Sequence, residues 1–344
     1  MLHRSGVPRP VCYRPAVTIS RAKRASKSSL LGTFSLLVLL LLVARFALLQ
    51  CRARPAKTPA SLPSAQLPPS KPPAESQGDG GAAPLRGTEA SISSSVHVAL
   101  GTPRDADPLD EYFIDQRAFV LSYSPEKRVA NWVAWQLDRK HLGHVRRRDD
   151  FRADLALPAR FYRVKESDYL HSGYDRGHLC PSADRQHSAE DNSRTFLFTN
   201  IEPQLHELNA GPWEQLERYA RERARAGALL FIVAGGLFSA PFPTIGNGVA
   251  VPAASFKIIV VLESGQAVND VNESSEVLAV LMPNQPGVGD RDWMEYGTTV
   301  DAIEQASGYD FLNAVPERVQ RVIEARTLVA PERRSGRRAG ETAR

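Results

Sequence analysis

Residues 51–100 contain few of the side chains that build a protein core, and seven prolines lie between residues 55 and 73. Such a segment cannot bury enough apolar surface to offset the entropy lost on ordering, so it predicts a disordered linker. Folding is thereby confined to residues 101–330, and the Arg-rich residues 331–344 are expected to form a disordered basic tail. A body of about 230 residues is long enough to bury a full core.

An apolar segment, residues 30–50, precedes the linker and follows a basic segment, residues 1–29, with seven Lys and Arg and no acid. The charge bias places the N-terminus in the cytoplasm. About 21 residues suffice for a transmembrane anchor, whereas the 15 residues before Arg45 suit a cleaved signal peptide. Two further interpretations of this segment are a lipoprotein cleavage site at Cys51 and a buried helix of a soluble protein. The three membrane interpretations place the body outside the cytoplasm, periplasmic or extracellular at the cell membrane, or secreted after cleavage.

The net charge of +5 does not belong to the body. Residues 102–327 carry 25 Lys and Arg against 33 Asp and Glu. Any binding of nucleic acid by the body must therefore come from a local arginine cluster. Three cysteines, of which only Cys180 lies in the body, exclude a disulfide scaffold and a Cys-rich zinc fold.

The body is expected to mix strands and helices. The apolar, β-branched runs predict strands at residues 119–124, 229–238, 256–263 and 277–282. Helical spacing of apolar residues predicts helices at residues 125–138, 214–225, 299–306 and 317–326. The strands do not alternate regularly with long helices, so we expect an α+β fold around a mainly antiparallel sheet rather than a doubly wound parallel sheet.

The first segment that suggests chemistry is Asp175-Arg-Gly-His178. His178 can take a proton near neutral pH. Arg176 is a permanent cation that can bind a phosphate in a bidentate manner, and Gly177 allows a ligand to approach the backbone closely. A base beside a fixed cation is what attack on a phosphodiester requires. A salt-bridged turn without a catalytic role explains the same residues and stays open.

The second segment runs from Asn209 to Arg221. Asn209, Trp213, Glu217 and Arg221 are spaced by four residues, which places them near one face of a helix. Asn209 and Glu217 offer the oxygen atoms that Mg²⁺ prefers, and Trp213 is expected to be a core anchor. A surface ion pair between Glu217 and Arg221 is the alternative.

Together with residues 128–133, 147–154, 199–204 and 307–312, these segments resemble the DNA/RNA non-specific endonucleases with a ββα-metal (His-Me finger) site. That family includes mitochondrial endonuclease G and secreted bacterial nucleases, and the likeness is strongest to the cyanobacterial secreted nuclease. It covers roughly residues 120–324. The resemblance implies a ββα-metal fold and a metal-dependent endonuclease that cuts DNA and RNA to 5′-phosphate products. The implied metal is Mg²⁺, with Mn²⁺ as the alternative.

The resemblance also implies roles for individual residues. His178 would be the general base that deprotonates the attacking water. Asn209 would be the direct protein ligand of the metal, and Glu217 would hold metal-bound waters. Asn200 would help to orient the site, and Asp175 would support it.

Three arginines would bind the scissile or neighbouring phosphates: Arg147, Arg176 and Arg221. Because Arg146 and Arg148 flank Arg147, a shift by one residue stays open. The expected partners are the phosphate backbone of DNA and RNA, the membrane through the N-terminal segment, and a second copy of the chain in a homodimer.

Some residues depart from the family pattern or lie outside it. Cys180 replaces a small residue and is expected to be inert packing, with a redox-sensitive thiol as the alternative. Glu202 would add a carboxylate near the metal face. His141 and His144 are two metal-ligand candidates without a third. The rival functions are a narrower phosphodiesterase or exonuclease on the same scaffold and a non-catalytic nucleic-acid-binding protein.

Overall fold

The structure is a computed structural model that describes residues 88–106 and 110–328. All of them belong to the second of two compact units, Asp79–Arg344. The predicted basic N-terminus, the anchor or signal peptide, most of the linker and the tail lie outside the described residues. In the described part, no helix combines the length and the apolar character needed to cross a membrane.

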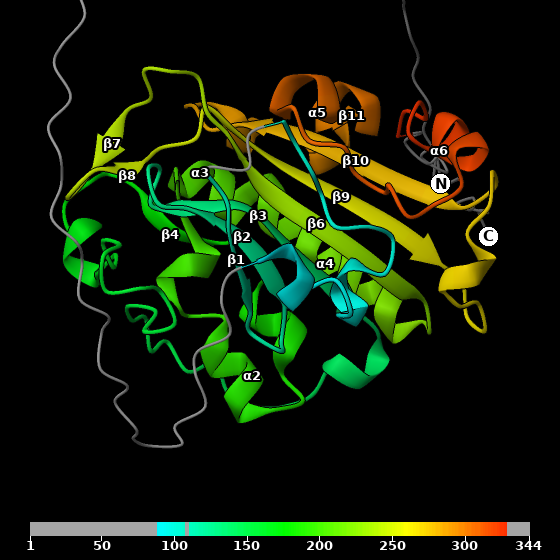
Figure 1. Ribbon diagram of the computed structural model, residues 1–344, viewed down its shortest axis with the longest axis horizontal. Coiled ribbons are helices and arrows are strands. Elements are labelled where there is room, and N and C mark those ends of the chain that lie inside the picture. Colours follow the sequence, from blue (N-terminus) through cyan, green and yellow to red (C-terminus); the bar gives the residue numbers. More distant parts are fainter. Residues whose placement is uncertain (1–87, 107–109, 329–344) are drawn as a thin grey trace, which may run out of the picture. The chain divides into compact units, whose positions relative to one another are not determined.

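An antiparallel sheet of seven strands forms the centre of this unit, in the order β1-β2-β3-β6-β9-β10-β11 (Figure 1). Every neighbouring pair is antiparallel. The strands are β1 (Tyr112–Asp115), β2 (Val120–Ser124), β3 (Val129–Leu137), β6 (Leu229–Leu237), β9 (Ala254–Leu262), β10 (Glu276–Pro283) and β11 (Gly297–Thr298). The predicted α+β fold with a mainly antiparallel sheet is confirmed, as are the four predicted strands.

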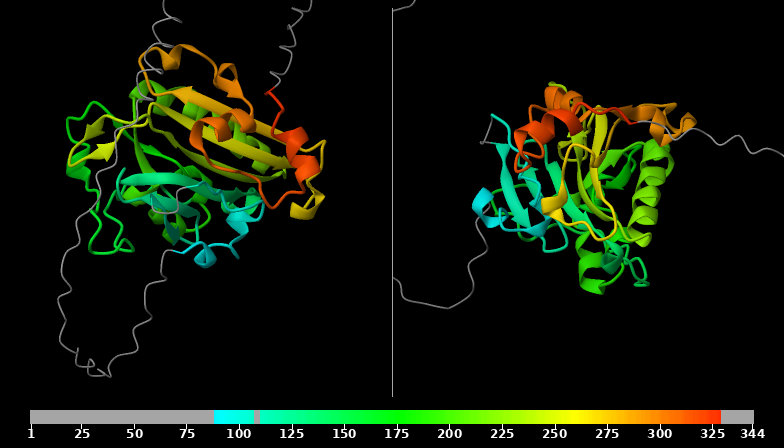
Figure 2. Two further views of the ribbon diagram at one scale, coloured as in Figure 1. Left: turned by 45° about the horizontal axis from the view of Figure 1, so that its top comes forward. Right: turned by 90° about the vertical axis from the view of Figure 1, so that its right-hand side faces the viewer.

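Both faces of the sheet are covered. On β9, Ile259 and Val261 belong to the core cluster that also contains apolar residues of α4 (Glu214–Arg225). The alternate residues Ile258 and Val260 belong to a second cluster with residues of α5 (Val300–Ser307) and α6 (Glu317–Ile323). Because side chains alternate along a strand, one apolar run supplies both cores. Figures 1 and 2 show α4 on one side of the sheet and α5 and α6 on the other.

The helix predicted at residues 125–138 is wrong, because the chain forms strand β3 there. Eight of its nine residues are buried. Trp135 packs in the α4-side cluster, and Trp132 packs in the opposite cluster. A strand with two buried faces shows no polar alternation, so its apolar residues were misread as one side of a helix.

The folded unit also begins before the predicted end of the linker. Residues 88–100 contain two short 3₁₀ helices, Glu89–Ser91 and Val96–Val98. Ile92, Val98 and Leu100 are buried in the cluster beneath α5 and α6. These few apolar residues at the end of a Pro-rich stretch find their partners on the distant sheet.

A smaller unit lies at one end of the sheet. Strand β4 (Asp175–His178) pairs antiparallel with β5 (Ile201–Gln204), and α3 (His206–Leu208) follows β5. One turn of π-helix, Asn209–Trp213, joins α3 to α4. Two strands and a helix thus form the ββα unit that the resemblance implies.

The remaining elements are short. They are α2 (Ala189–Arg194), the β7–β8 pair (Thr244–Ile245 and Val249–Ala250), and 3₁₀ helices at Arg139–His141, Glu166–Asp168, Ser182–Arg185, Phe198–Asn200, Val268–Asp270, Val288–Asp290 and Trp293–Tyr296.

Candidate active site

His178 is the last residue of β4 and is only 7% exposed. Its ring lies edge-on to Phe196, with centroids 5.0 Å apart, and also contacts Phe151. Burial, reinforced by Arg147 and Arg176, lowers the pKa of His178 to about 3. The imidazole is therefore neutral at physiological pH, and its Nε2 has no hydrogen-bond partner among the described residues. The buried Nε2 is out of reach of solvent, but the ring itself lies on a cavity wall, where a neutral imidazole can accept a proton.

A cavity of about 350 Å³ lies beside His178 and the start of α4. Six of the eight residues predicted from the sequence line it: Arg147, Arg176, His178, Asn209, Glu217 and Arg221. We call it the catalytic cavity. The imidazole and the amide thus lie on the wall of one cavity, although they come from different elements and are 31 residues apart in the chain.

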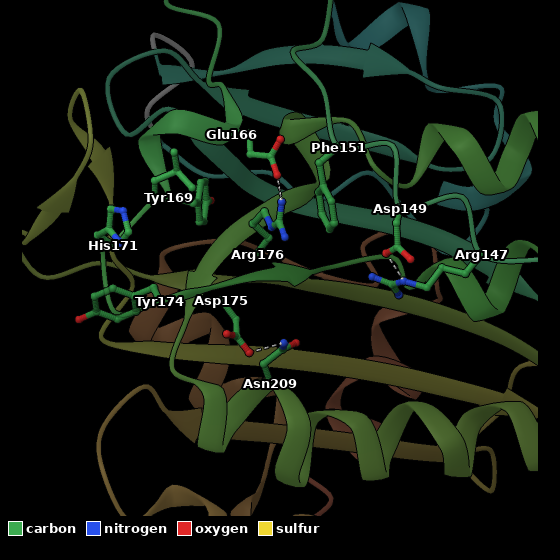
Figure 3. A pocket seen from close by; sticks show the side chains of 11 residues that line it. Arg147, Asp149, Phe151, Glu166, Tyr169, His171, Tyr174, Asp175, Arg176 and Asn209 are labelled. Carbon is green, nitrogen blue, oxygen red and sulfur yellow. Dashed lines mark hydrogen bonds and ion pairs between the residues drawn. The ribbon is translucent and has the colours of Figure 1, made fainter.

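Asn209 and Asp175 are held together at the edge of this cavity. The Asn209 amide Nδ2 donates to Asp175 Oδ2 at 2.9 Å, and His206 Nδ1 lies 2.8 Å from the same oxygen. The contact fixes the amide so that its oxygen is turned away from Asp175 (Figure 3). In the described part of the chain, that oxygen accepts no hydrogen bond. A free amide oxygen with carboxylates in the same cavity is a donor set that fits a hard divalent cation.

The backbone at Asn209 departs from the ideal helix that the four-residue spacing assumes. Gly211, inside the π-helical turn, has φ −102° and ψ −118°, so the backbone from Asn209 to Trp213 is not an ideal α-helix. Trp213 is the expected core anchor, 1% exposed. Its indole Nε1 donates to the His178 carbonyl oxygen at 3.0 Å, which ties the start of α4 to the end of β4.

Glu217 lies between two buried cations. Arg221 Nη1 is 3.6 Å from one carboxylate oxygen, and Lys257 Nζ is 3.6 Å from the other. Burial raises the pKa of Glu217, and the two cations counteract that shift. The predicted alternative of a surface ion pair is wrong, because the Glu217 and Arg221 side chains are 11% and 10% exposed.

Lys257 is the site residue that the sequence reasoning missed. It lies on β9, is 1% exposed, and its Nζ is 3.9 Å from the centroid of the Trp213 ring. The signal was a single lysine inside a β-branched run. A buried lysine requires a negative partner, and Glu217 supplies it from α4.

Arg221 has a second acidic partner, Asp184, at 3.3 Å. Asp184 is 1% exposed, and its other oxygen accepts a hydrogen bond from Trp135 Nε1 at 2.9 Å. The guanidinium therefore faces the catalytic cavity from a fixed position, anchored from behind by a buried carboxylate.

Asn200 does not line the catalytic cavity. It is fully buried, and its side chain spans Cys180 and Thr195 through three hydrogen bonds of 2.8–2.9 Å to backbone groups. The Asn200 carbonyl also accepts from Leu179 N. These bonds fix the chain immediately after His178, which is what an orienting role requires.

Arg147 and Arg176 line the catalytic cavity together with Asn209. Arg147 Nη1 donates to Ser182 Oγ at 3.1 Å, and its guanidinium lies 4.9 Å from the Phe196 ring centroid. Arg146 and Arg148 do not line the catalytic cavity. Of the three consecutive arginines, Arg147 is the one that lines this cavity.

The departures from the family pattern have structural explanations. Cys180 is buried, and burial raises the pKa of its thiol well above the usual range, as inert packing requires. Glu202 does not line the catalytic cavity. Its Oε1 accepts hydrogen bonds from Ser255 and Gln204, so its expected place near the metal face is wrong. His141 pairs with Asp138 at 3.0 Å, and His144 is exposed.

A neutral buried imidazole, a free amide oxygen near carboxylates, and three arginines share one cavity on a ββα unit. This combination defines a hydrolase of phosphodiesters. Comparison with known proteins gives the same class. Residues 101–318 match the family model of the DNA/RNA non-specific endonucleases, and the chain belongs to this family.

Individual relatives also point to a nuclease, and a solved structure shares the fold. The chain is 45% identical to a nuclease of Nostoc sp. over 70% of this chain and 88% of that protein. It is 32% identical to human mitochondrial endonuclease G over 57% of this chain and 68% of that protein. A chain of the EndoG/EndoGI complex shares the fold, with a TM-score of 0.57 and 24% identity over 68% of this chain and 96% of that chain.

Proposed function

We propose that this nuclease is a Mg²⁺-dependent endonuclease that hydrolyses DNA and RNA to 5′-phosphate products, with Mn²⁺ as an alternative metal. The observation that carries the proposal is the catalytic cavity, which brings His178, Asn209, Glu217 and the three arginines together.

His178 takes the proton of the attacking water in this proposal. Its neutral ring and its position on the wall of the catalytic cavity support that role. Asn200 keeps the following backbone in place, and Trp213 holds the His178 carbonyl. Arg147, Arg176 and Arg221 stabilise the negative charge on the phosphate oxygens as it grows in the transition state.

The free oxygen of Asn209 would hold the metal, with Asp175 fixing the amide and Glu217 accepting hydrogen bonds from metal-bound waters. When bound, a divalent ion would neutralise the charge on the leaving oxygen. None of these contacts reads a base, so cutting by these groups is independent of sequence.

The test is nicking of supercoiled plasmid by the purified chain with Mg²⁺, with and without a chelator. A circular substrate has no ends, so nicking separates an endonuclease from an exonuclease. His178→Ala should lower the rate by about 10²–10⁴-fold, the usual contribution of a general base. His144→Ala, an exposed histidine outside the cavity, is the matched control. A His178→Ala variant as active as the control would refute the assignment of the base.

We further propose that the folded body acts outside the cytoplasm, at the membrane or after release, and that two copies form a homodimer. The basic and apolar residues 1–50 support the location. Alkaline phosphatase fused after residue 100 should be active, because it requires an oxidising compartment. Inactive fusions would contradict the location.

Light scattering of the purified protein measures its mass and shows whether two copies form the proposed homodimer.

A further inference from the structure

A second cavity, of about 360 Å³, adjoins the catalytic cavity. The two share three lining residues, Arg147, Arg176 and Asn209. In Figure 3, Arg176 lies at the centre of the second cavity, with Tyr169, His171 and Tyr174 on one side of it and Phe151 on the other. A group in this cavity would therefore lie next to the group held in the catalytic cavity.

The charges in the second cavity do not suit a phosphate. Arg147 Nε is 2.6 Å from Asp149 Oδ1, and Arg176 Nη1 is 2.5 Å from Glu166 Oε1. Each guanidinium therefore has a carboxylate partner here through one nitrogen and keeps other N–H groups for the phosphate in the catalytic cavity. Asp175 adds a third carboxylate to the lining. Three carboxylates repel a second phosphate but accept hydrogen bonds from a neutral group that carries amino donors.

Flat π-systems face this cavity. The Arg176 guanidinium lies 4.2 Å from the centroid of the Phe151 ring. Tyr174 is half-buried, and the buried Tyr169 ring is stacked on Phe198 at 5.5 Å, which makes a fixed wall. Aromatic and guanidinium planes of this kind stack on nucleobases without selecting among them.

The loop that carries these rings contains a strained residue. His171 is exposed and has φ +57°, a left-handed conformation that side chains other than glycine rarely adopt. The neighbouring Gly173 has φ +82°. The two left-handed residues fold the loop so that His171 and Tyr174 reach the same cavity.

We infer that the second cavity binds a nucleobase that has left its stack, on the nucleotide adjoining the phosphate in the catalytic cavity. The inference rests on the proposed function. A base in a duplex is paired and stacked on its neighbours, and it must be turned out before it can enter. The cavity therefore favours single-stranded DNA and RNA over duplexes.

The test uses an end-labelled single-stranded oligonucleotide with one abasic nucleotide at its centre, and a matched oligonucleotide with the base present. The full-length protein is used with Mg²⁺. At one phosphate next to the abasic nucleotide, cleavage should fall about tenfold, the loss expected when one stacked base is missing. Distant phosphates serve as internal references.

Two variants assign the effect to this cavity. His171→Gly removes the ring and suits the left-handed backbone, so the variant should fold. Tyr174→Leu keeps an apolar side chain but removes the aromatic plane. In each variant, the rate of cleavage next to the normal nucleotide, divided by the rate next to the abasic one, should be closer to one than in the wild type. Each variant should also lose part of the preference for single strands. Tyr112→Leu, which packs on Phe161 outside both cavities, is the matched control and should behave as wild type.

Equal cleavage of both oligonucleotides by the wild type would overturn the inference but leave the nuclease function intact. A tenfold defect that persists in both variants would also overturn it, because the base would then bind elsewhere. Absence of cleavage at every phosphate, including those far from the abasic nucleotide, would instead contradict the proposed function.

Discussion

Lys257→Met removes a buried charge that the structure ties to Glu217. The two side chains are 1% and 11% exposed, and Nζ lies 3.6 Å from Oε1. Methionine fills a similar volume without the ammonium group. The substitution therefore leaves one negative charge uncompensated among Asp184, Glu217 and Arg221, the buried groups that contact one another.

The magnitude follows from the geometry. Two unit charges 3.6 Å apart attract by about 5 kcal/mol at an effective dielectric constant near 20. Removing the ammonium also removes its own desolvation cost, which amounts to several kcal/mol. The net loss expected for breaking a buried pair is about 3–5 kcal/mol in the free energy of unfolding. That loss is a large part of the roughly 5–15 kcal/mol that stabilises a typical protein.

The assay is urea unfolding of the wild type, Lys257→Met, Glu217→Gln and the double variant. Neutralising Glu217 should relieve the charge that Lys257→Met leaves, so the double variant should be more stable than additivity predicts, by about 0.5–3 kcal/mol. Arg318→Met is the control, since it breaks an exposed ion pair with Glu273 and should cost at most about 1 kcal/mol. Additive losses for Lys257 and Glu217 would refute the reasoning.

Three further predictions concern buried polar groups. Trp135→Phe deprives the buried Asp184 of a hydrogen bond and should lower the free energy of unfolding by about 1–3 kcal/mol in urea; an unchanged midpoint would contradict it. Asn200→Ala leaves the Cys180 N–H and C=O without their side-chain partner. The backbone amides after His178 should therefore exchange hydrogen faster, and the cleavage rate should fall with them. If exchange stays slow while cleavage falls, the orienting role is wrong. Burial raises the pKa of Glu202 to about 7. Ionisation of its carboxyl group therefore lowers the stability of the fold as the pH rises from about 4.5 to 7. Glu202→Gln should raise the free energy of unfolding by up to about 3 kcal/mol at pH 8 but little at pH 4. Equal effects at both pH values would show that Glu202 is not the titrating group.

Local patterns were sufficient for most of the fold. The β-branched runs of β6, β9 and β10 identify strands because such residues favour a pleated, buried surface. The same rule failed at β3, where Trp132 and Trp135 face opposite cores. Sequence spacing cannot distinguish a strand buried on both faces from a helix when the partners of each face are far away in the chain.

In the site, too, residues of one short motif could be predicted, whereas residues brought together from distant elements could not. Asp175, Arg176 and His178 come from one strand, so their short motif identified them together. The group on α4 was found by assuming an ideal helix, although a π-helical turn separates Asn209 from Glu217. Lys257 comes from β9, 40 residues after Glu217, and nothing near it in the sequence predicts its partner.

The contrast between Glu202 and Glu217 explains why motif membership is not enough to assign a carboxylate to the site. Both are fully or nearly fully buried, and burial raises the pKa of both. Glu202 faces Ser255 and Gln204, which donate hydrogen bonds but carry no charge. Glu217 faces Lys257 and Arg221, which favour its ionised form. Glu217 also lines the catalytic cavity and Glu202 does not, so position and close cationic partners, rather than membership of a motif, distinguish the two glutamates.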